Sequence, residues 1–253
     1  MAVDHALALP RHCSQAIFPD TATMSAALAD RVAAMLRHAL GCRGAATLVV
    51  SGGRSPAAFL RALGQRELDW SRVAVTLADE RWVPPGHPDS NAGMVKANLL
   101  QGPAAAASFV PLYGGEEHPA AGVASCTERL RGVPRPFDVV VLGMGEDGHF
   151  ASLFPGVAGL ENLLAASAPA SASAPASASA LAAIVPPGAA HPRMTQTLPA
   201  LLDARNVLLQ INGARKRAVI EEAAAHGDPL RQPVAALMQQ TATPIRVFFC
   251  PSE

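Results

Sequence analysis

The chain has 253 residues, which is enough for one large α/β domain or two small ones. Twenty basic and twenty acidic side chains cancel, so no long-range field attracts nucleic acid or an anionic membrane. We therefore expect neither as a partner, and we expect any anionic ligand to be held by a local pocket. Half of the residues are hydrophobic but only 4% are aromatic, a composition typical of alanine-rich helices packed closely on a sheet.

The cysteines and the N-terminal segment bear on the cellular compartment. The four cysteines are scattered, without CxxC spacing or a nearby histidine framework, which favours free thiols over a zinc site or disulfides. The N-terminal segment carries Asp4 and His5 and lacks a basic stretch followed by an apolar core, and no uncharged apolar stretch has membrane-spanning length. We expect a cytoplasmic protein.

Hydrophobic periodicity predicts helices and strands in alternation. A helix is predicted over about 23–40, with Gly41 as its stop signal. The later elements, in chain order, are a strand over 47–51, a helix over 56–63, a strand over 73–78, a short helix or helix start over 95–100, strands over 137–142 and 206–211, a helix over 214–225 and a strand over 246–249. This alternation predicts a three-layer α/β fold, with a mostly parallel open sheet flanked by helices.

Residues 165–180 form a low-complexity tract of alanine, serine and proline. Such a segment cannot bury enough apolar surface to order itself, so we predict a flexible surface loop. A linker between two domains is the alternative. Because the chain beyond the tract continues the α/β pattern, we expect residues 1–253 to form a single domain.

A glycine-rich turn follows the first predicted strand. Backbone N–H groups around Gly52, Gly53 and Arg54 form a candidate phosphate cradle ahead of a helix, and Ser51 and Ser55 add hydroxyl donors. The alternative is an ordinary tight turn between a strand and a helix. The turn is not a Walker A loop, because no GKS or GKT follows.

Charged residues follow the strand over 73–78. Arg81 offers a planar donor fork suited to phosphate or carboxylate, and Asp79 is suited to sugar hydroxyls or acid–base work. The structural alternative is that Asp79 and Arg81 pair with each other or with neighbours and hold the loop. His87 in the same loop is expected to be an exposed structural residue.

Two further basic segments are candidates for anion binding. Lys216 lies on the opening turn of the helix over 214–225, where positive charge is unfavourable unless an anion lies close by. Lys216, with Arg215 or Arg217, therefore indicates a second phosphate contact, and a solvated basic helix face is the alternative. The segment HPRMTQT adds Arg193 as a further candidate.

The densest cluster of reactive side chains follows the strand over 137–142. Glu146, Asp147 and His149 lie there in a glycine-rich loop, and ligands of parallel sheets collect beyond the carboxyl ends of strands. His149 is suited to draw a proton from water, while Asp147 or Glu146 orients the ring and stabilises its protonated form.

Other chemistries fit this loop poorly. It formally matches the GxGxxG dinucleotide fingerprint, but its carboxylates would face a pyrophosphate, and Pro155 and Gly156 interrupt the helix that should follow. There is no GxSxG elbow and no HExxH spacing. We therefore expect neither a metal ion nor a cofactor.

Four segments, taken together and in order, resemble the 6-phosphogluconolactonases of the oxidative pentose phosphate pathway. They are SGGRSP, LADERWVPPGHPDSN, VLGMGEDGHFASLFPG and RMTQTLPALLDARNVLLQINGARK, and the resemblance spans about 18–249. It implies hydrolysis of 6-phospho-D-glucono-1,5-lactone to 6-phospho-D-gluconate. The implied fold is related to those of glucosamine-6-phosphate deaminases and ribose-5-phosphate isomerases. Nothing in the sequence demands a partner chain, so we expect a monomer, with a dimer as the alternative.

The resemblance also implies residue roles. His149 is similar to the family's general base for water and Asp147 to its adjacent acid. The residues similar to substrate and phosphate contacts are Gly52, Gly53, Arg81 and Lys216, with Arg193 as an addition. The chain departs from the family at Ser55 and Phe150, where Thr is common. Phe150 thereby lacks a hydroxyl beside His149.

Two rival functions remain. A sugar-phosphate deaminase resembles this pattern, but there Asn-Glu-Pro follows the DGH loop and its Glu assists the catalytic His, whereas residues 150–155 contain no acid. A non-catalytic sugar-phosphate sensor would keep Gly52, Gly53 and Lys216 and discard the base. The presence of both Asp147 and His149 argues against the sensor.

Overall fold

The computed structural model describes residues 6–53, 55–165 and 180–252. Arg54 and residues 166–179 lie outside this range. The flexible loop expected over 165–180 therefore stays a prediction. No helix within the described ranges is long and apolar enough to span a membrane.

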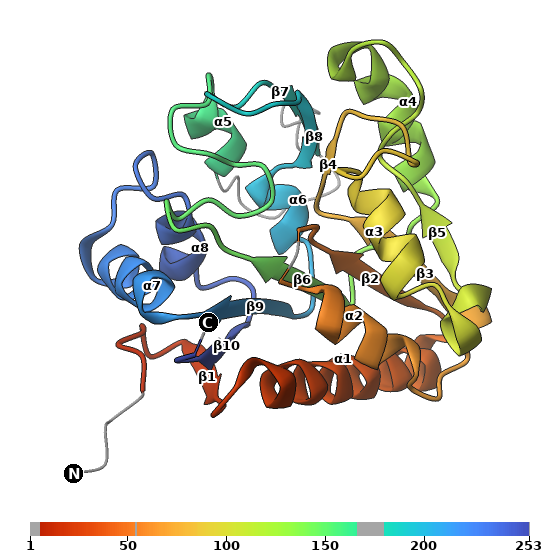
Figure 1. Ribbon diagram of the computed structural model, residues 1–253, viewed down its shortest axis with the longest axis horizontal. Coiled ribbons are helices and arrows are strands. Elements are labelled where there is room, and N and C mark those ends of the chain that lie inside the picture. Colours follow the sequence, from red (N-terminus) through yellow and green to blue (C-terminus); the bar gives the residue numbers. More distant parts are fainter. Residues whose placement is uncertain (1–5, 54, 166–179, 253) are drawn as a thin grey trace.

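The central sheet of the described chain has seven strands, all parallel, in the order β1-β10-β9-β6-β2-β3-β5 (Figure 1). Its strands are β1 (Cys13–Ile17), β2 (Ala46–Val50), β3 (Val73–Leu77), β5 (Ser108–Val110), β6 (Val139–Gly143), β9 (Val207–Asn212) and β10 (Ile245–Cys250). A smaller antiparallel sheet contains β4 (Asp79–Arg81), β8 (Arg193–Gln196) and β7 (Leu181–Ile184).

Helices flank the central sheet (Figure 1), which confirms the predicted α/β class. They are α1 (Thr21–Arg43), α2 (Ala57–Gly64), α3 (Asn91–Asn98), α4 (Pro119–Arg131), α5 (Leu160–Leu164), α6 (Leu198–Leu202), α7 (Ala214–His226) and α8 (Val234–Gln239), with short 3₁₀ turns at Trp70–Arg72 and Gly102–Ala106. The strands β2 and β6 are buried almost throughout, as expected for apolar strands covered on both faces.

Helix α1 corrects one boundary. Gly41 was predicted to end it, but the helix continues to Arg43. Gly44 provides the stop, because it adopts a left-handed backbone with φ 76° and donates its N–H to the carbonyl of Leu40. At the other end Asp20 caps the helix by accepting a hydrogen bond from the N–H of Thr23 at 2.7 Å.

The register of the parallel strands positions the loops that follow them. Val50 at the end of β2 pairs with Leu77 of β3 and with Val141 of β6, and Gly143 pairs with Gln210 of β9. These strands run in one direction, so the loops that follow β2, β3, β6 and β9 leave the same edge of the sheet. All of the predicted functional segments except HPRMTQT belong to these loops.

Candidate active site

His149 and Asp147 form a pair at the carboxyl end of β6. Nδ1 of His149 lies 2.5 Å from Oδ1 of Asp147, and the same oxygen accepts the backbone N–H of His149 at 3.1 Å. Partial burial by itself raises the pKa of Asp147, but the hydrogen bonds and charge of His149 outweigh it and hold that pKa below its usual value. A carboxylate only accepts, so Nδ1 carries a proton, and in the neutral form of the ring Nε2 has the lone pair.

Gly145 makes this pairing possible. A Cβ at Gly145 would lie 2.2 Å from the His149 ring and 2.6 Å from Oδ1 of Asp147. The loop also closes on itself, because Gly145 donates its N–H to the carbonyl of His149 at 2.9 Å. Gly148 has φ 78°, and its carbonyl accepts a hydrogen bond from the N–H of Val234, the first residue of α8. The loop is therefore held by its own turn and by the helix beside it.

The segment after His149 fixes the ring and ties the loop to the smaller sheet. Phe154 stacks on His149 with ring centroids 4.0 Å apart, and the guanidinium of Arg193 lies 5.3 Å from the Phe154 centroid. Ser152 is buried and donates its hydroxyl to Oδ2 of Asp79 at 2.5 Å. Phe150 is fully buried in the core, so this position does not supply the site with a side chain.

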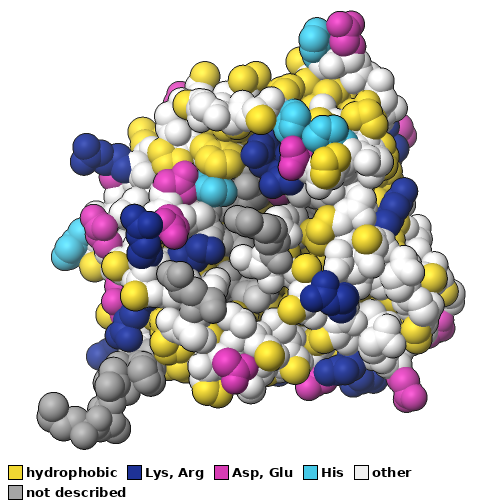
Figure 2. All heavy atoms as spheres, viewed as in Figure 1, with side chains coloured by type: hydrophobic (Ala, Val, Ile, Leu, Met, Phe, Trp, Pro, Cys, Tyr) yellow, Lys and Arg dark blue, Asp and Glu magenta, His cyan; other side chains and the backbone are white. Residues whose placement is uncertain are grey.

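One cavity of about 160 Å³ brings the predicted residues together. Its lining includes Gly52, Gly53, Ser55, Asp79, Arg81, His149, Arg193 and Lys216. Asp147 holds the ring of His149, and Arg54 lies outside the described residues. Figure 2 shows basic and histidine side chains around the middle of the face that Figure 1 presents.

Several buried polar atoms of the described cavity lining have no partner within the protein. They are Oγ of Ser51, Oδ1 of Asn91 and the Nε atoms of Arg81 and Arg193. Buried donors and acceptors without partners are costly, so such a concentration at one place indicates a site built for a polar ligand. Two of these atoms are guanidinium donors, which favours an anion.

Asp79 and Arg81 serve both interpretations offered by the sequence. Asp79 is buried, accepts from Ser152, lies 3.7 Å from Nη1 of Arg193 and contacts Asn91, so it holds neighbouring side chains in place. Arg81 donates from Nη1 to the carbonyl of Asp89 at 2.7 Å. Both also line the cavity. Asp79 and Arg81 therefore each pair with neighbouring residues, as the structural alternative predicted. These contacts leave both side chains in the lining of the cavity.

Glu80 anchors α3 beside the cavity. Its buried carboxylate accepts the backbone N–H groups of Arg81, Asn91 and Ala92 at 2.7–2.8 Å and the hydroxyl of Ser90 at 3.3 Å. Burial raises the pKa of Glu80 to about 7, although the N–H donors act in the opposite direction. This anchor places Asn91 against Gly52, where a Cβ would lie 1.8 Å from Oδ1 of Asn91.

The three adjacent cations of α7 have different surroundings. Arg215 is exposed and pairs with Glu146 at 3.0 Å, and Arg217 pairs with Glu221 at 3.1 Å and donates to the carbonyl of Ala6. Lys216 lines the cavity. Of the candidates in this segment, Lys216 is thus the one placed for a ligand.

Sequence reasoning missed several residues of the site. Asn91 and Gln210 line the cavity, and Phe154 and Ser152 organise it. Each lies inside or beside a segment that was singled out, but its side-chain type carries no distinctive signal. Ala151 also lines the cavity and has φ 48°, a left-handed backbone that is uncommon for a residue with a side chain.

A family model described as glucosamine-6-phosphate isomerases/6-phosphogluconolactonase matches residues 19–245. The chain belongs to this family. A 6-phosphogluconolactonase of Rhizobium meliloti is 43% identical over 235 residues, which cover 93% of this chain and 97% of the relative. One from Pseudomonas aeruginosa is also 43% identical, over 241 residues that cover 94% and 96%.

Solved structures support the same membership. The crystal structure of a 6-phosphogluconolactonase from Shewanella baltica is 36% identical, has a TM-score of 0.88 and covers 97% of this chain and 100% of its own. A monomeric glucosamine-6-phosphate deaminase is 16% identical with a TM-score of 0.69, which shows a shared fold. The family resemblance and the predicted relationship to the deaminase fold are confirmed. The relationship to ribose-5-phosphate isomerases stays a prediction.

Replacing Gly145 tests whether its lack of a side chain allows His149 and Asp147 to pair. Gly145→Ala places a methyl group inside the His149–Asp147 pair, so we expect the pair to separate and kcat to fall by about 100-fold, as for small displacements of catalytic groups. In the ¹⁵N NMR spectrum of the neutral ring, the proton of His149 should no longer reside mainly on Nδ1, because Asp147 no longer accepts it. Gly143→Ala is the matched control, because nothing lies within 4 Å of its added Cβ. Equal ¹⁵N spectra for both variants would contradict the steric argument.

Glu80 gives a pH-dependent test. Its native pKa of about 7 exceeds the value of 4.5 of an unperturbed glutamate, so the stability that Glu80 contributes is full below pH 4.5 and is lost as pH rises through 7. Relative to Glu80→Gln, the wild-type free energy of unfolding should fall by about 2 kcal/mol between pH 5 and pH 8. Urea unfolding at both pH values measures this. A difference that does not change with pH would mean that the N–H donors keep Glu80 ionised.

Proposed function

We propose that the protein hydrolyses 6-phospho-D-glucono-1,5-lactone to 6-phospho-D-gluconate in the cytoplasm. One observation carries the proposal: a carboxylate-paired histidine opens into the same small cavity as two arginines, a lysine and a glycine turn. A phosphate anchor and a base for water are the two devices that this reaction needs. The relatives that carry the name 6-phosphogluconolactonase support the assignment.

The phosphate end of the substrate lies among Arg81, Arg193 and Lys216, with the amides of Gly52 and Gly53 beside them. Arginine forks and backbone N–H groups suit a phosphate dianion, and Lys216 adds a point charge on the first turn of α7. This anchoring uses the non-reacting end of the molecule to position the lactone ring.

His149 acts on water through Nε2. Its Nδ1–H is held by Asp147, so the lone pair of Nε2 accepts a proton from water while the resulting hydroxide attacks C1 of the lactone. Asp147 stabilises the imidazolium that forms. The stacked ring of Phe154 keeps the imidazole in one plane during the transfer.

Ring opening then completes the reaction. The tetrahedral intermediate carries an oxyanion on the former carbonyl, which backbone N–H groups of the loop or a nearby cation stabilise. Its collapse breaks the bond between C1 and the ring oxygen, and the ring oxygen takes the proton from His149. The carboxylic acid product ionises in water, and His149 returns to its neutral form. These steps use only side chains, backbone amides and water.

A deaminase function is less well supported. In place of the Glu that follows the DGH loop of deaminases, this chain has residues 150–155, in which Phe150 is buried and Phe154 stacks on His149. No carboxylate of this segment is therefore available to assist His149. Ammonia release from glucosamine 6-phosphate would favour that function over lactone hydrolysis.

Replacing His149 tests the proposed base. The lactone also hydrolyses spontaneously, so purified wild type and His149→Ala are compared with a no-enzyme reaction. We expect His149→Ala to lower kcat by about 10²–10⁴-fold, the range for removal of a general base. Asp147→Asn should lose less and move the acid limb of the pH–rate profile to lower pH, because the imidazolium loses its charged partner. Equal rates for wild type, variant and blank would overturn the proposal.

Replacing Lys216 tests the phosphate anchor. Lys216→Ala should raise KM for the lactone about tenfold or more, the effect of one charge-assisted hydrogen bond, with kcat little changed. Arg217→Ala is the control, since Arg217 is paired with Glu221 and the carbonyl of Ala6. Competitive inhibition by inorganic phosphate should weaken in Lys216→Ala alone. An unchanged KM in Lys216→Ala would contradict the assignment.

A further inference from the structure

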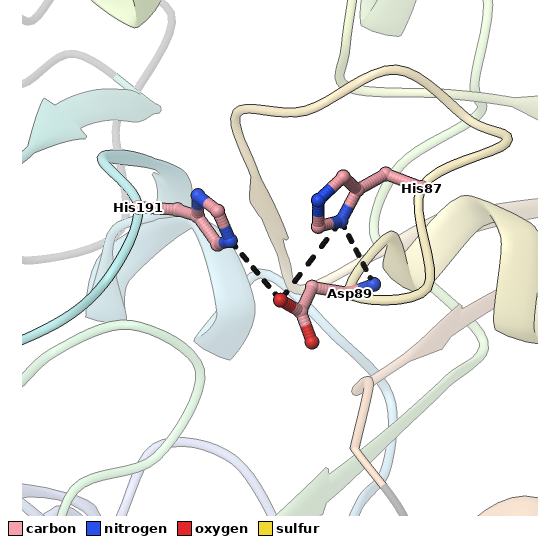
Figure 3. A group of neighbouring side chains, drawn as sticks. All are labelled: His87, Asp89 and His191. Carbon is pink, nitrogen blue, oxygen red and sulfur yellow. Dashed lines mark hydrogen bonds and ion pairs between the residues drawn. The ribbon is translucent and has the colours of Figure 1, made fainter.

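Three side chains beside the cavity take no part in the proposed reaction. His87 and Asp89 lie in the loop between β4 and α3, and His191 lies just before β8, 102 residues beyond Asp89. Figure 3 shows the two imidazole rings on either side of the Asp89 carboxylate, each with a nitrogen directed at the same oxygen. Two histidines and a carboxylate from distant segments thus meet at one point.

The spacing of the three donor atoms suits a metal ion. Nε2 of His191 lies 3.0 Å and Nδ1 of His87 lies 3.9 Å from Oδ2 of Asp89, and all three ligand atoms lie within 4.8 Å of one another. In a tetrahedral zinc site with bonds of about 2.0–2.1 Å, ligand atoms are roughly 3.4 Å apart. Small side-chain rotations therefore bring the three atoms to coordination distance.

The hydrogen bonding of His87 also favours a cation. Nδ1 of His87 accepts the backbone N–H of Asp89 at 3.1 Å, so this nitrogen presents a lone pair. The same nitrogen faces the carboxylate oxygen of Asp89, and two acceptors then face each other without a proton between them. A cation placed between them is attracted by both, and His87 exchanges its bond with the N–H for a bond to the ion.

Access and location fit binding from solvent. The side chain of Asp89 is 55% exposed, while those of His87 and His191 are 38% and 27% exposed and meet edge to face. Asp89 and Arg81 also line a larger open cavity of about 680 Å³, which shares Gly53, Arg81 and Asn91 with the candidate active site. Through Asp89 the cluster therefore borders a cavity that adjoins the candidate active site.

We propose that His87, Asp89 and His191 bind one divalent transition-metal ion of the zinc class, with water completing its coordination. Imidazole nitrogens and a carboxylate oxygen are a common donor set for Zn²⁺. The ion links the β4–α3 loop to the segment before β8, next to the carbonyl of Asp89 that holds Arg81. It takes no part in lactone hydrolysis. The sequence prediction that no metal is bound rested on the absence of short ligand motifs. Such motifs cannot reveal ligands that lie 102 residues apart in the chain, as Asp89 and His191 do.

Isothermal titration of metal-free protein with ZnCl₂ tests this site independently of activity. Cys42 and His38 lie 3.7 Å apart on α1 and offer a competing pair of ligands, so the titrations use the Cys42→Ser background. We expect one Zn²⁺ per chain, and affinity reduced about tenfold or more in His191→Ala and in Asp89→Asn. His118→Ala is the control, because His118 is exposed and distant in sequence from all three ligands.

Cobalt provides a second readout. Co²⁺ in the Cys42→Ser protein should give visible ligand-field bands without a thiolate charge-transfer band, and His87→Ala should abolish them. Melting temperatures in EDTA check that each variant is folded, and His87→Gln replaces His87→Ala if the latter is destabilised. Saturable binding that is equal in wild type and in all three ligand variants would overturn the proposal, as would no binding of either metal by the wild type.

Discussion

The parallel register of the central strands is the constraint on which the site depends. β2, β3, β6 and β9 run in one direction, so the glycine turn, the Asp79–Arg81 segment, the His149 loop and the start of α7 leave one edge of the sheet. Hydrogen bonding between neighbouring strands fixes the ends of these four strands to within two residues of one another from each strand to the next. Segments separated by more than a hundred positions in the sequence thereby form a single cavity.

Two local devices complete what the sheet begins. Two glycines let the backbone approach a side chain where a Cβ would not fit. Gly145 lies against the ring of His149, and Gly52 lies against the side chain of Asn91. Buried carboxylates hold the supporting elements, since Glu80 fixes the start of α3 and Asp79 accepts from Ser152. The chain as a whole has no net charge, yet Arg81, Arg193 and Lys216 all line the proposed phosphate end of the cavity.

The parts of this arrangement that follow from local sequence could be predicted. The His149–Asp147 pair spans three positions, and strands such as β6 are apolar throughout, so both were identified. Contacts set by tertiary packing could not. The short β4 is largely charged, Gln210 is a polar side chain on a buried strand, and Phe154 gains its role by stacking on His149. His191 meets Asp89 only because β8 pairs with β4.

In the proposed reaction one cavity holds the phosphate at one end and the reacting carbonyl at the other. A crystal structure of the protein with 6-phosphogluconate, the product of the proposed reaction, tests it most directly. We predict the phosphate within hydrogen-bond distance of Lys216 and of at least one of Arg81 and Arg193, with the C1 carboxylate beside Nε2 of His149. Product bound with its phosphate against His149, or bound outside this cavity, would show that the two ends of the site are wrongly assigned.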